Sequence, residues 1–275
     1  MKIRTDLALE NKEYIENEVL DGVVSQKEIK DNIKITRIEI INGNGSRLLD
    51  KPLGRYSTFE YPDIISISSD SVKILKSEIK VFLPDDGLIL IAGLGNEKIT
   101  ADSLGPKCID KIIATRHIHY NRAVSPVPSP FTFACVKTDV SAKTGIEASE
   151  MILGLVKTIK PKALIIIDSL GARNYKRLGS VIQISDIGIV PGSGVKNHRN
   201  EISKRTLNIP VISIGAPTVI DGSAINENED FLADDDFENV FLTSKNIDFI
   251  VSRASYVISS ALNSILKDKI NITVL

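Results

Sequence analysis

Two aspartates follow apolar segments that are typical of buried strands. Asp102 comes seven residues after Gly95, in the loop that follows Leu88–Ala92, and Asp168 directly follows Ala163–Ile167. Because ligands of open α/β sheets bind beyond the carboxyl ends of the strands, we expect both carboxyls to lie at one edge of the sheet. Two carboxyls held close together share a proton, so one can accept a proton from water while the other donates one. This pair could hydrolyse an amide without a metal ion or a nucleophilic side chain.

Other functions of these residues remain open at this point. Gly93 and Gly95 fill two positions of the dinucleotide fingerprint Gly-x-Gly-x-x-Gly, but Lys98 stands where the third glycine is needed. No Gly-Lys-Ser/Thr phosphate loop is present. The structural alternative for Asp102 is that it caps a helix beginning at Ser103. An aspartate at a strand end can also simply bind the N–H groups of its own loop.

Composition argues against several other kinds of site. The 34 Lys and Arg residues nearly balance the 35 Asp and Glu residues, so we expect no direct binding of nucleic acid. The three histidines share no metal-ligand spacing, and the two cysteines, Cys108 and Cys135, fit no zinc or redox motif. The sequence therefore predicts neither a metal site nor a cofactor.

The N-terminus and the hydropathy pattern indicate a cytosolic protein. The first residues, MKIRTDLALENKEY, lack the uninterrupted apolar core of a signal peptide. No uninterrupted apolar run approaches the roughly 20 residues that span a bilayer. We expect no membrane segment.

Short apolar runs alternate with helical patterns along most of the chain. The predicted strands, rich in Ile, Val and Leu, are Leu88–Ala92, Ala163–Ile167, Val181–Ile184 and Val211–Ile214. The predicted helices are Ser103–His117, Gly145–Ile159 and Ser244–Leu266. This alternation predicts an α/β fold, a mostly parallel sheet with helices on both faces.

Residues 1–85 have a different pattern. Asn32–Asn42 alternates as a half-exposed strand does, a loop rich in turn residues follows, and Ser69–Val81 is predicted as a helix. We interpret residues 7–85 as an extension packed on a core of residues 86–275, all within one domain of 275 residues.

Several longer stretches carry a resemblance to a known family. The chain resembles the germination protease of spore-forming bacteria over nearly its whole length. The matching stretches are IRTDLALE, KPLGRYSTFE, GLGNEKITADSLGP, TGIEASE, IIIDSLGAR and the segment Gln183–Asp221. The last is the most specific, since its glycine and proline pattern belongs to no common superfamily motif.

This resemblance implies a fold, a site and a mechanism. The fold would be similar to the phosphorylase/hydrolase-like core of hydrogenase maturation proteases, and the two aspartates of an aspartic-type peptidase would be Asp102 and Asp168. Hydrogenase maturation proteases bind nickel through an acidic residue after a similar loop. Here Ser103 follows Asp102 with no adjacent acidic residue, which favours a metal-free mechanism. Gly93, Gly95 and Asn96 would shape the loop and could offer N–H groups to the oxyanion.

The resemblance also implies substrates, an assembly and a location. The substrates would be the small acid-soluble spore proteins that coat DNA, the assembly a homotetramer, and the location the cytoplasm of the forespore and spore core. The chain is shorter than the family pattern near Asp221–Phe237, where an acidic loop stands, so substrate preference could differ.

The start of the chain resembles the family's own cleavage site. Family substrates are cut after an acidic residue, and Thr5-Asp6-Leu7-Ala8 has that form. Family members are made as zymogens that cut themselves at such a sequence, so we expect cleavage between Asp6 and Leu7 to remove a propeptide of residues 1–6. The alternative is that Thr5 caps a first helix and that nothing is cut.

Two rival functions are kept beside the two-aspartate endopeptidase. One is a metal-dependent maturation-type protease of the same fold. The other is a non-catalytic α/β binding module in which both aspartates cap helices.

Overall fold

The computed structural model describes residues 5–15, 20–62, 68–120, 129–190, 200–222 and 240–267. Two sequence predictions fall partly outside these ranges. They are the first four residues of the expected propeptide and residues 223–237 of the short acidic region.

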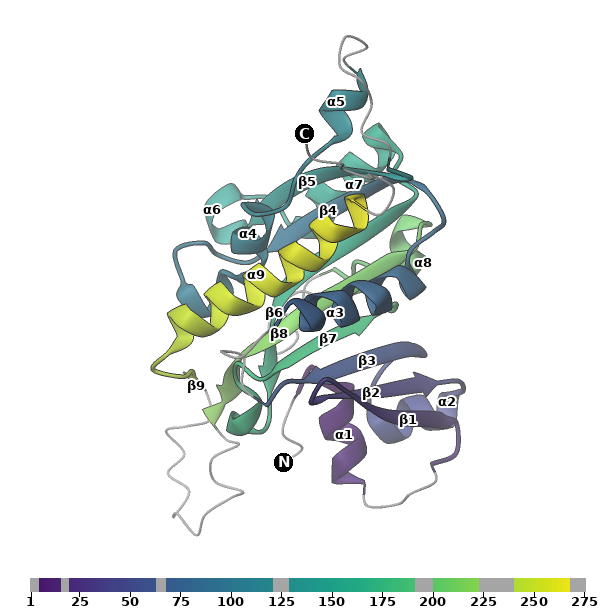
Figure 1. Cartoon of the computed structure of the whole chain (residues 1–275), viewed down its shortest axis with the longest axis vertical. Helices are drawn as coiled ribbons and strands as arrows, with labels where there is room; N and C mark the ends of the chain where they lie inside the picture. Colours follow the sequence, from purple (N-terminus) through teal and green to yellow (C-terminus); the bar gives the residue numbers. More distant parts are fainter. Residues whose placement is uncertain are drawn as a thin grey trace.

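A single sheet forms the centre of the molecule (Figure 1). Its strand order is β1-β2-β3-β7-β8-β6-β4-β5, with β9 added beside β8. The strands are β1 Val23–Lys30, β2 Ile33–Ile40, β3 Gly54–Glu60, β4 Gly87–Leu94, β5 Phe131–Asp139, β6 Ala163–Ala172, β7 Val181–Ser185, β8 Val211–Asp221 and β9 Phe241–Leu242.

The predicted α/β class is confirmed, and the sheet is mostly but not wholly parallel. β5, β4, β6 and β8 pair in parallel, whereas β7 pairs antiparallel with both β8 and β3. β7 had been placed in the parallel set because its apolar run lacks polar alternation. The link from β6 to β7, residues 173–180, is too short for a parallel connection, which needs about a dozen residues or more.

Helices cover both faces of the sheet. α3, α4 and α9 pack on one face of its centre, and α7 and α8 pack on the other. The helices are α1 Ala8–Tyr14, α2 Gly43–Leu49, α3 Ser69–Phe82, α4 Leu104–Ile109, α5 Arg116–Tyr120, α6 Ser141–Thr144, α7 Ala148–Ile159, α8 Lys204–Leu207 and α9 Ile247–Leu266, with the 3-10 turns η2 Thr100–Asp102 and η3 Tyr175–Arg177.

The prediction of one helix over Ser103–His117 is wrong in extent, because the chain breaks between α4 and α5. Asn263 of α9 supplies the reason. Its side chain accepts from the N–H of Ile113 at 2.9 Å and donates to the carbonyl of Lys111 at 2.8 Å. These bonds satisfy backbone groups that a continuous helix would have paired internally.

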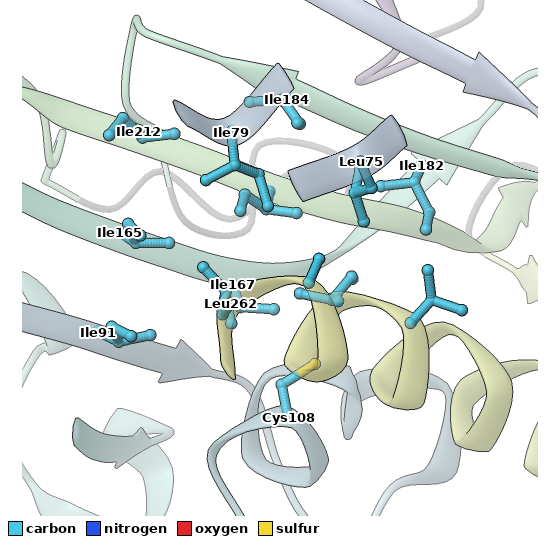
Figure 2. Packing of buried hydrophobic residues seen from close by; sticks show 14 of the residues in the cluster. Leu75, Ile79, Ile91, Cys108, Ile165, Ile167, Ile182, Ile184, Ile212 and Leu262 are labelled. Atoms are coloured by element: carbon cyan, nitrogen blue, oxygen red, sulfur yellow. The ribbon is translucent and has the colours of Figure 1, made fainter. Parts of the chain in front are cut away.

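Alternate residues of the central strands fill two separate cores. Ile165 and Ile167 of β6 belong to the core under α9, where Leu262 and the thiol of Cys108 also lie (Figure 2). Leu164 and Ile166 belong to the core under α7. Burial on both faces explains why these strands are continuous apolar runs.

α9 is long and apolar enough to cross a membrane by length and composition alone. In the structure it lies across the sheet beside α3 (Figure 1). Its Val251, Ile258 and Leu262 are fully buried. Packing in the core of the domain therefore accounts for its apolar character.

The N-terminal extension continues the central sheet. β1, β2 and β3 form antiparallel pairs, and β3 pairs with β7 from Tyr56↔Ser185 to Glu60↔Val181. α1 and α2 cover one face of these strands, where Leu9 and Leu49 are fully buried. Neither β1 nor β3 is among the predicted strands. The pairing of β3 with β7 brings the extension to the edge of the parallel strands.

Candidate active site

A cavity of about 610 Å³ opens where β4 ends beside β6, and both predicted catalytic residues line it. Asp102 comes from η2 and Asp168 from β6. The structure thus brings together two carboxyls that are 66 positions apart in the chain.

Asp168 lies where β6 loses one of its neighbours. β4 pairs with β6 only up to Gly93↔Ile167, whereas β8 follows β6 through to Ala172. Asp168 is therefore the first residue of β6 beyond the end of β4, and one side of it is open. Its Oδ1 accepts a hydrogen bond from the N–H of Ser169 at 2.8 Å.

Asp102 is brought over this opening by a tight turn after β4. Gly95 has a φ of +104°, and a Cβ there would lie 2.0 Å from the carbonyl oxygen of Asp102. Only a residue without a side chain fits this approach. The Oδ2 of Asp102 accepts from the N–H of Asn96 at 2.7 Å, so this carboxylate does bind its own loop. η2 also packs against β6 and β8, which carries Asp102 to the edge beside Asp168.

Asp102 is not the N-cap residue of α4, as the structural alternative would have it. The N-cap of α4 is Ser103, and that position makes no side-chain capping bond. The carboxylate of Asp102 faces the loop and the cavity, with Asn96 as a donor.

The three predicted oxyanion-loop residues have different surroundings. Gly95 lines the cavity. Gly93 lies inside β4 between Lys137 and Ile167 of the adjacent strands, and the N–H of Asn96 is directed at Asp102. In this conformation the loop stabilises the carboxylate of Asp102, and an oxyanion role stays a prediction for Gly93, Gly95 and Asn96.

The floor of the cavity is one row of residues across three strands. Gln183 of β7 is opposite Gly215 of β8, and Gly215 is opposite Asp168 of β6. All three line the cavity. A Cβ at Gly215 would lie 2.7 Å from the carbonyl oxygen of Asp168 and 2.6 Å from Leu170 Cγ. The glycine makes room for the side chain of Leu170, which lies over it.

Two hydroxyls in the cavity wall have hydrogen-bonding capacity left. Within the described part of the chain, Ser169 Oγ and Thr218 Oγ1 are buried without a hydrogen-bond partner. Buried polar atoms are nearly always paired, so these atoms mark places where a bound polar group could be received.

The predicted cleavage site lies at the border of the same cavity. Asp6 lines it, and its N–H donates to the carbonyl of Gly171 at 2.9 Å. The N–H of Gly171 in turn donates to Asp6 Oδ2 at 2.7 Å. Leu7 is fully buried in a small cluster that includes Ala172 and Val181. The segment therefore lies along the last residues of β6, three positions beyond Asp168.

The alternative in which Thr5 is the N-cap of the first helix is wrong in detail. The N-cap of α1 is Leu7, which makes no side-chain capping bond. Thr5 Oγ1 accepts from the N–H of Leu7 at 3.1 Å and also bonds to Glu10. The loop before the helix is thus fixed by its own side chains.

Lys51 is a charged neighbour that the sequence analysis did not single out. It lines the cavity, and its Nζ donates to the carbonyl of Thr5 at 2.8 Å. Burial lowers the pKa of Lys51, while the carboxylates of Asp6, Asp50 and Glu10 oppose that shift.

No candidate metal centre emerges from the part of the chain that the structure describes. There, no three His, Cys, Asp or Glu side chains are gathered as a set of metal ligands.

Comparisons with known proteins identify the family of this chain. A family model described as germination protease matches residues 3–235. The chain belongs to the germination protease family. Residues 102 and 168 both fall inside the matched region, as does the extension from residue 3 onward.

Several curated relatives carry the same description. The germination protease of Clostridium perfringens (strain SM101 / Type A) is 37% identical over 250 residues, covering 85% of this chain and 75% of that protein. That of Caldanaerobacter subterraneus subsp. tengcongensis is 38% identical over 229 residues, covering 81% and 71%. That of Priestia megaterium is 38% identical over 243 residues, covering 82% and 65%. Membership in this family supports the conclusion that the chain is a protease that acts in spores.

Among solved structures, the chain is similar to the NiFe hydrogenase maturation protease HycI from Thermococcus kodakarensis KOD1. The match has a TM-score of 0.40 and 15% identity, and covers 69% of this chain and 98% of that one.

Proposed function

We propose that this germination protease is a two-aspartate endopeptidase that starts the degradation of small acid-soluble, DNA-binding spore proteins during germination. Its place of action would be the cytoplasm of the forespore and spore core, and its working form a homotetramer. The observation that carries the proposal is that Asp102 and Asp168 line one cavity, with Asp6 of the N-terminal segment at its border.

The proposed reaction is hydrolysis of one peptide bond. One of the two carboxyls, ionised, takes a proton from a water molecule, whose oxygen adds to the carbonyl carbon. The other, protonated, gives its proton to the amide nitrogen as the carbon–nitrogen bond breaks. The products are a new carboxyl group and a new amine, and the pair ends with one proton, as it began.

We further propose that the chain is made as a zymogen and cuts itself between Asp6 and Leu7. Asp6 already touches β6 through two hydrogen bonds to Gly171, close to Asp168 on the same strand. The released piece would be Met1–Asp6.

The chain after the cut would stay in place. Glu10, almost fully buried, accepts from the backbone N–H groups of Arg173 at 2.7 Å and Asn174 at 3.0 Å. It also forms an ion pair with Arg177. Because these contacts are made by a residue that follows Leu7 in the chain, α1 stays in its position when residues 1–6 are removed.

The test is the intact mass of the purified full chain before and after incubation at mildly acid pH. Wild type, Asp102→Asn and Asp168→Asn are compared, each with and without a metal chelator. Loss of Met1–Asp6 in the wild type alone, unaffected by the chelator, is the expected result. Cleavage in all three proteins would refute the aspartate pair, and cleavage abolished by the chelator would refute the metal-free reaction.

The proposed substrate and the proposed homotetramer are tested by two separate measurements. A purified small acid-soluble spore protein, added to the wild type and to Asp168→Asn, should be cut by the wild type only. Light scattering of the purified protein should give four times the chain mass of 30.1 kDa. An uncut spore protein would refute the substrate, and a monomer mass would refute the tetramer.

A further inference from the structure

The peptide group between Asp6 and Leu7 is held by one side chain of the central sheet. Gln183 Nε2 donates to the carbonyl oxygen of Asp6 at 3.1 Å, and Gln183 Oε1 accepts from the N–H of Ala8 at 3.0 Å. The side-chain amide thus binds the backbone on both sides of Leu7, as a neighbouring strand would.

The same side chain faces the candidate catalytic residue across the cavity floor. Gln183, Gly215 and Asp168 form one row, so their side-chain positions share a face of the sheet. Two strand spacings, about 10 Å, separate Gln183 from Asp168, and the side chain of Leu170 lies over Gly215 between them.

We propose that Gln183 binds the chain that is to be cut and donates a hydrogen bond to its scissile carbonyl. The inference rests on the proposed cleavage between Asp6 and Leu7 and adds a residue to that site. When water adds to the Asp6 carbonyl carbon, its oxygen gains negative charge. A donor already 3.1 Å from that oxygen stabilises the charge without a further rearrangement.

Both contacts of Gln183 are to backbone atoms, so they carry over to other sequences. Gln183 is only 7% exposed, and a buried amide left without partners is costly. When Met1–Asp6 leaves, the Nε2 donor is released inside the cavity, where the carbonyl of a protein substrate can take its place.

A purely structural role for Gln183 would give a different result. It would lower the stability of the chain and leave the cleavage rate of each folded molecule unchanged. A donor to the reacting oxygen instead changes the rate, and its effect depends on whether it carries a proton.

The experiment measures the rate at which the full chain loses Met1–Asp6, by intact mass across pH, with melting temperature as the stability readout. Gln183→Met removes the amide with little change in shape, and Gln183→Glu keeps an acceptor but loses the N–H donor while ionised. Thr58→Val is the matched control. Thr58 is opposite Gln183 in β3, is fully buried, and has no hydrogen-bond partner for its hydroxyl among the described residues.

Gln183→Met should cleave about 100-fold more slowly, the effect of losing one oxyanion donor, and Thr58→Val should keep the wild-type rate. The rate of Gln183→Glu relative to wild type should rise as the pH falls toward about 4, because a protonated glutamate can donate. A wild-type rate in Gln183→Met, or a flat ratio for Gln183→Glu, would overturn this inference alone. A wild-type chain that keeps Met1–Asp6 would overturn the proposed cleavage together with it.

Discussion

Replacing Gly95 by alanine should displace Asp102 and disable the site while the fold survives. The turn at Gly95 has a φ of +104°, and an added Cβ would lie 2.0 Å from Asp102 O and 2.9 Å from Asp102 Oδ1. The obstacle is the backbone of η2, which cannot rotate away as the end of a long side chain could. The loop must therefore move.

The size of the effect follows from these distances. Real Cβ atoms do not come closer than about 3.0 Å to a carbonyl oxygen, so Asp102 O must retreat by about 1 Å. A misplacement of about 1 Å at a catalytic centre can lower the rate about 100-fold. The left-handed backbone adds a stability cost of about 1–2 kcal/mol.

Gly145→Ala separates the two contributions. Gly145 also has a left-handed φ, +70°, at the end of α6, but a Cβ there meets nothing within 4 Å. This control should lose about 1–2 kcal/mol of stability and keep its activity. The assay is the rate of loss of Met1–Asp6 at a temperature below both melting transitions, with urea unfolding for stability.

The reasoning would be refuted if Gly95→Ala cleaved itself at the wild-type rate. That result would mean that Asp102 tolerates a shift of its whole loop, which a residue acting on a positioned water cannot do. Equal loss of activity in both variants would instead trace the effect to stability alone.

Three further predictions concern stability and are read by urea unfolding. Gly154 lies exposed in α7 with nothing within 4 Å of an added Cβ, so Gly154→Ala should stabilise the chain by about 0.5–1 kcal/mol. Leu262, on the core-facing side of α9, is fully buried, so Leu262→Ala should cost about 2–5 kcal/mol. The third prediction concerns Glu78. Burial raises the pKa of its carboxyl, but hydrogen bonds from Arg37 and Ser57 outweigh burial and hold this pKa below its usual value. This stabilisation is present above about pH 4.5 and lost as the pH falls through the lowered pKa, so Glu78→Gln should flatten the acid limb of the stability profile.

The parallel core could be predicted because its sequence signal is local. The runs in β4, β6 and β8 are apolar on both faces. The prediction that Asp168 follows the end of its strand is wrong in detail, because β6 continues to Ala172 alongside β8 and Asp168 lies where pairing with β4 stops. Predicting the position of Asp102 required one further assumption, that a glycine turn after β4 returns the chain toward the neighbouring strand. Both residues do line one cavity, as predicted.

The remaining elements depend on partners that are distant in sequence. β3 lies in a stretch rich in turn residues, and it becomes a strand because β2 and β7 flank it. The break after α4 depends on Asn263, about 150 positions away. Gln183 did carry a signal, as the polar residue within an apolar run, but its function depends on where Asp6 lies.

The extension is part of the candidate active site because it builds one wall of the cavity. Tyr56 and Lys51 line the cavity together with Asp102 and Asp168 of the core. The hydroxyl of Tyr56 donates to Pro52 at 2.8 Å, which fixes the loop that carries Lys51. Because β3 is hydrogen-bonded to β7, cutting after Asp6 would remove the contact of Lys51 with Thr5 and open the border of the cavity, while the strand that carries Tyr56 would stay in place. Removing the whole extension would instead expose β7 as a sheet edge and take away the wall, so the proposed cut after Asp6 preserves the cavity whereas loss of the extension does not.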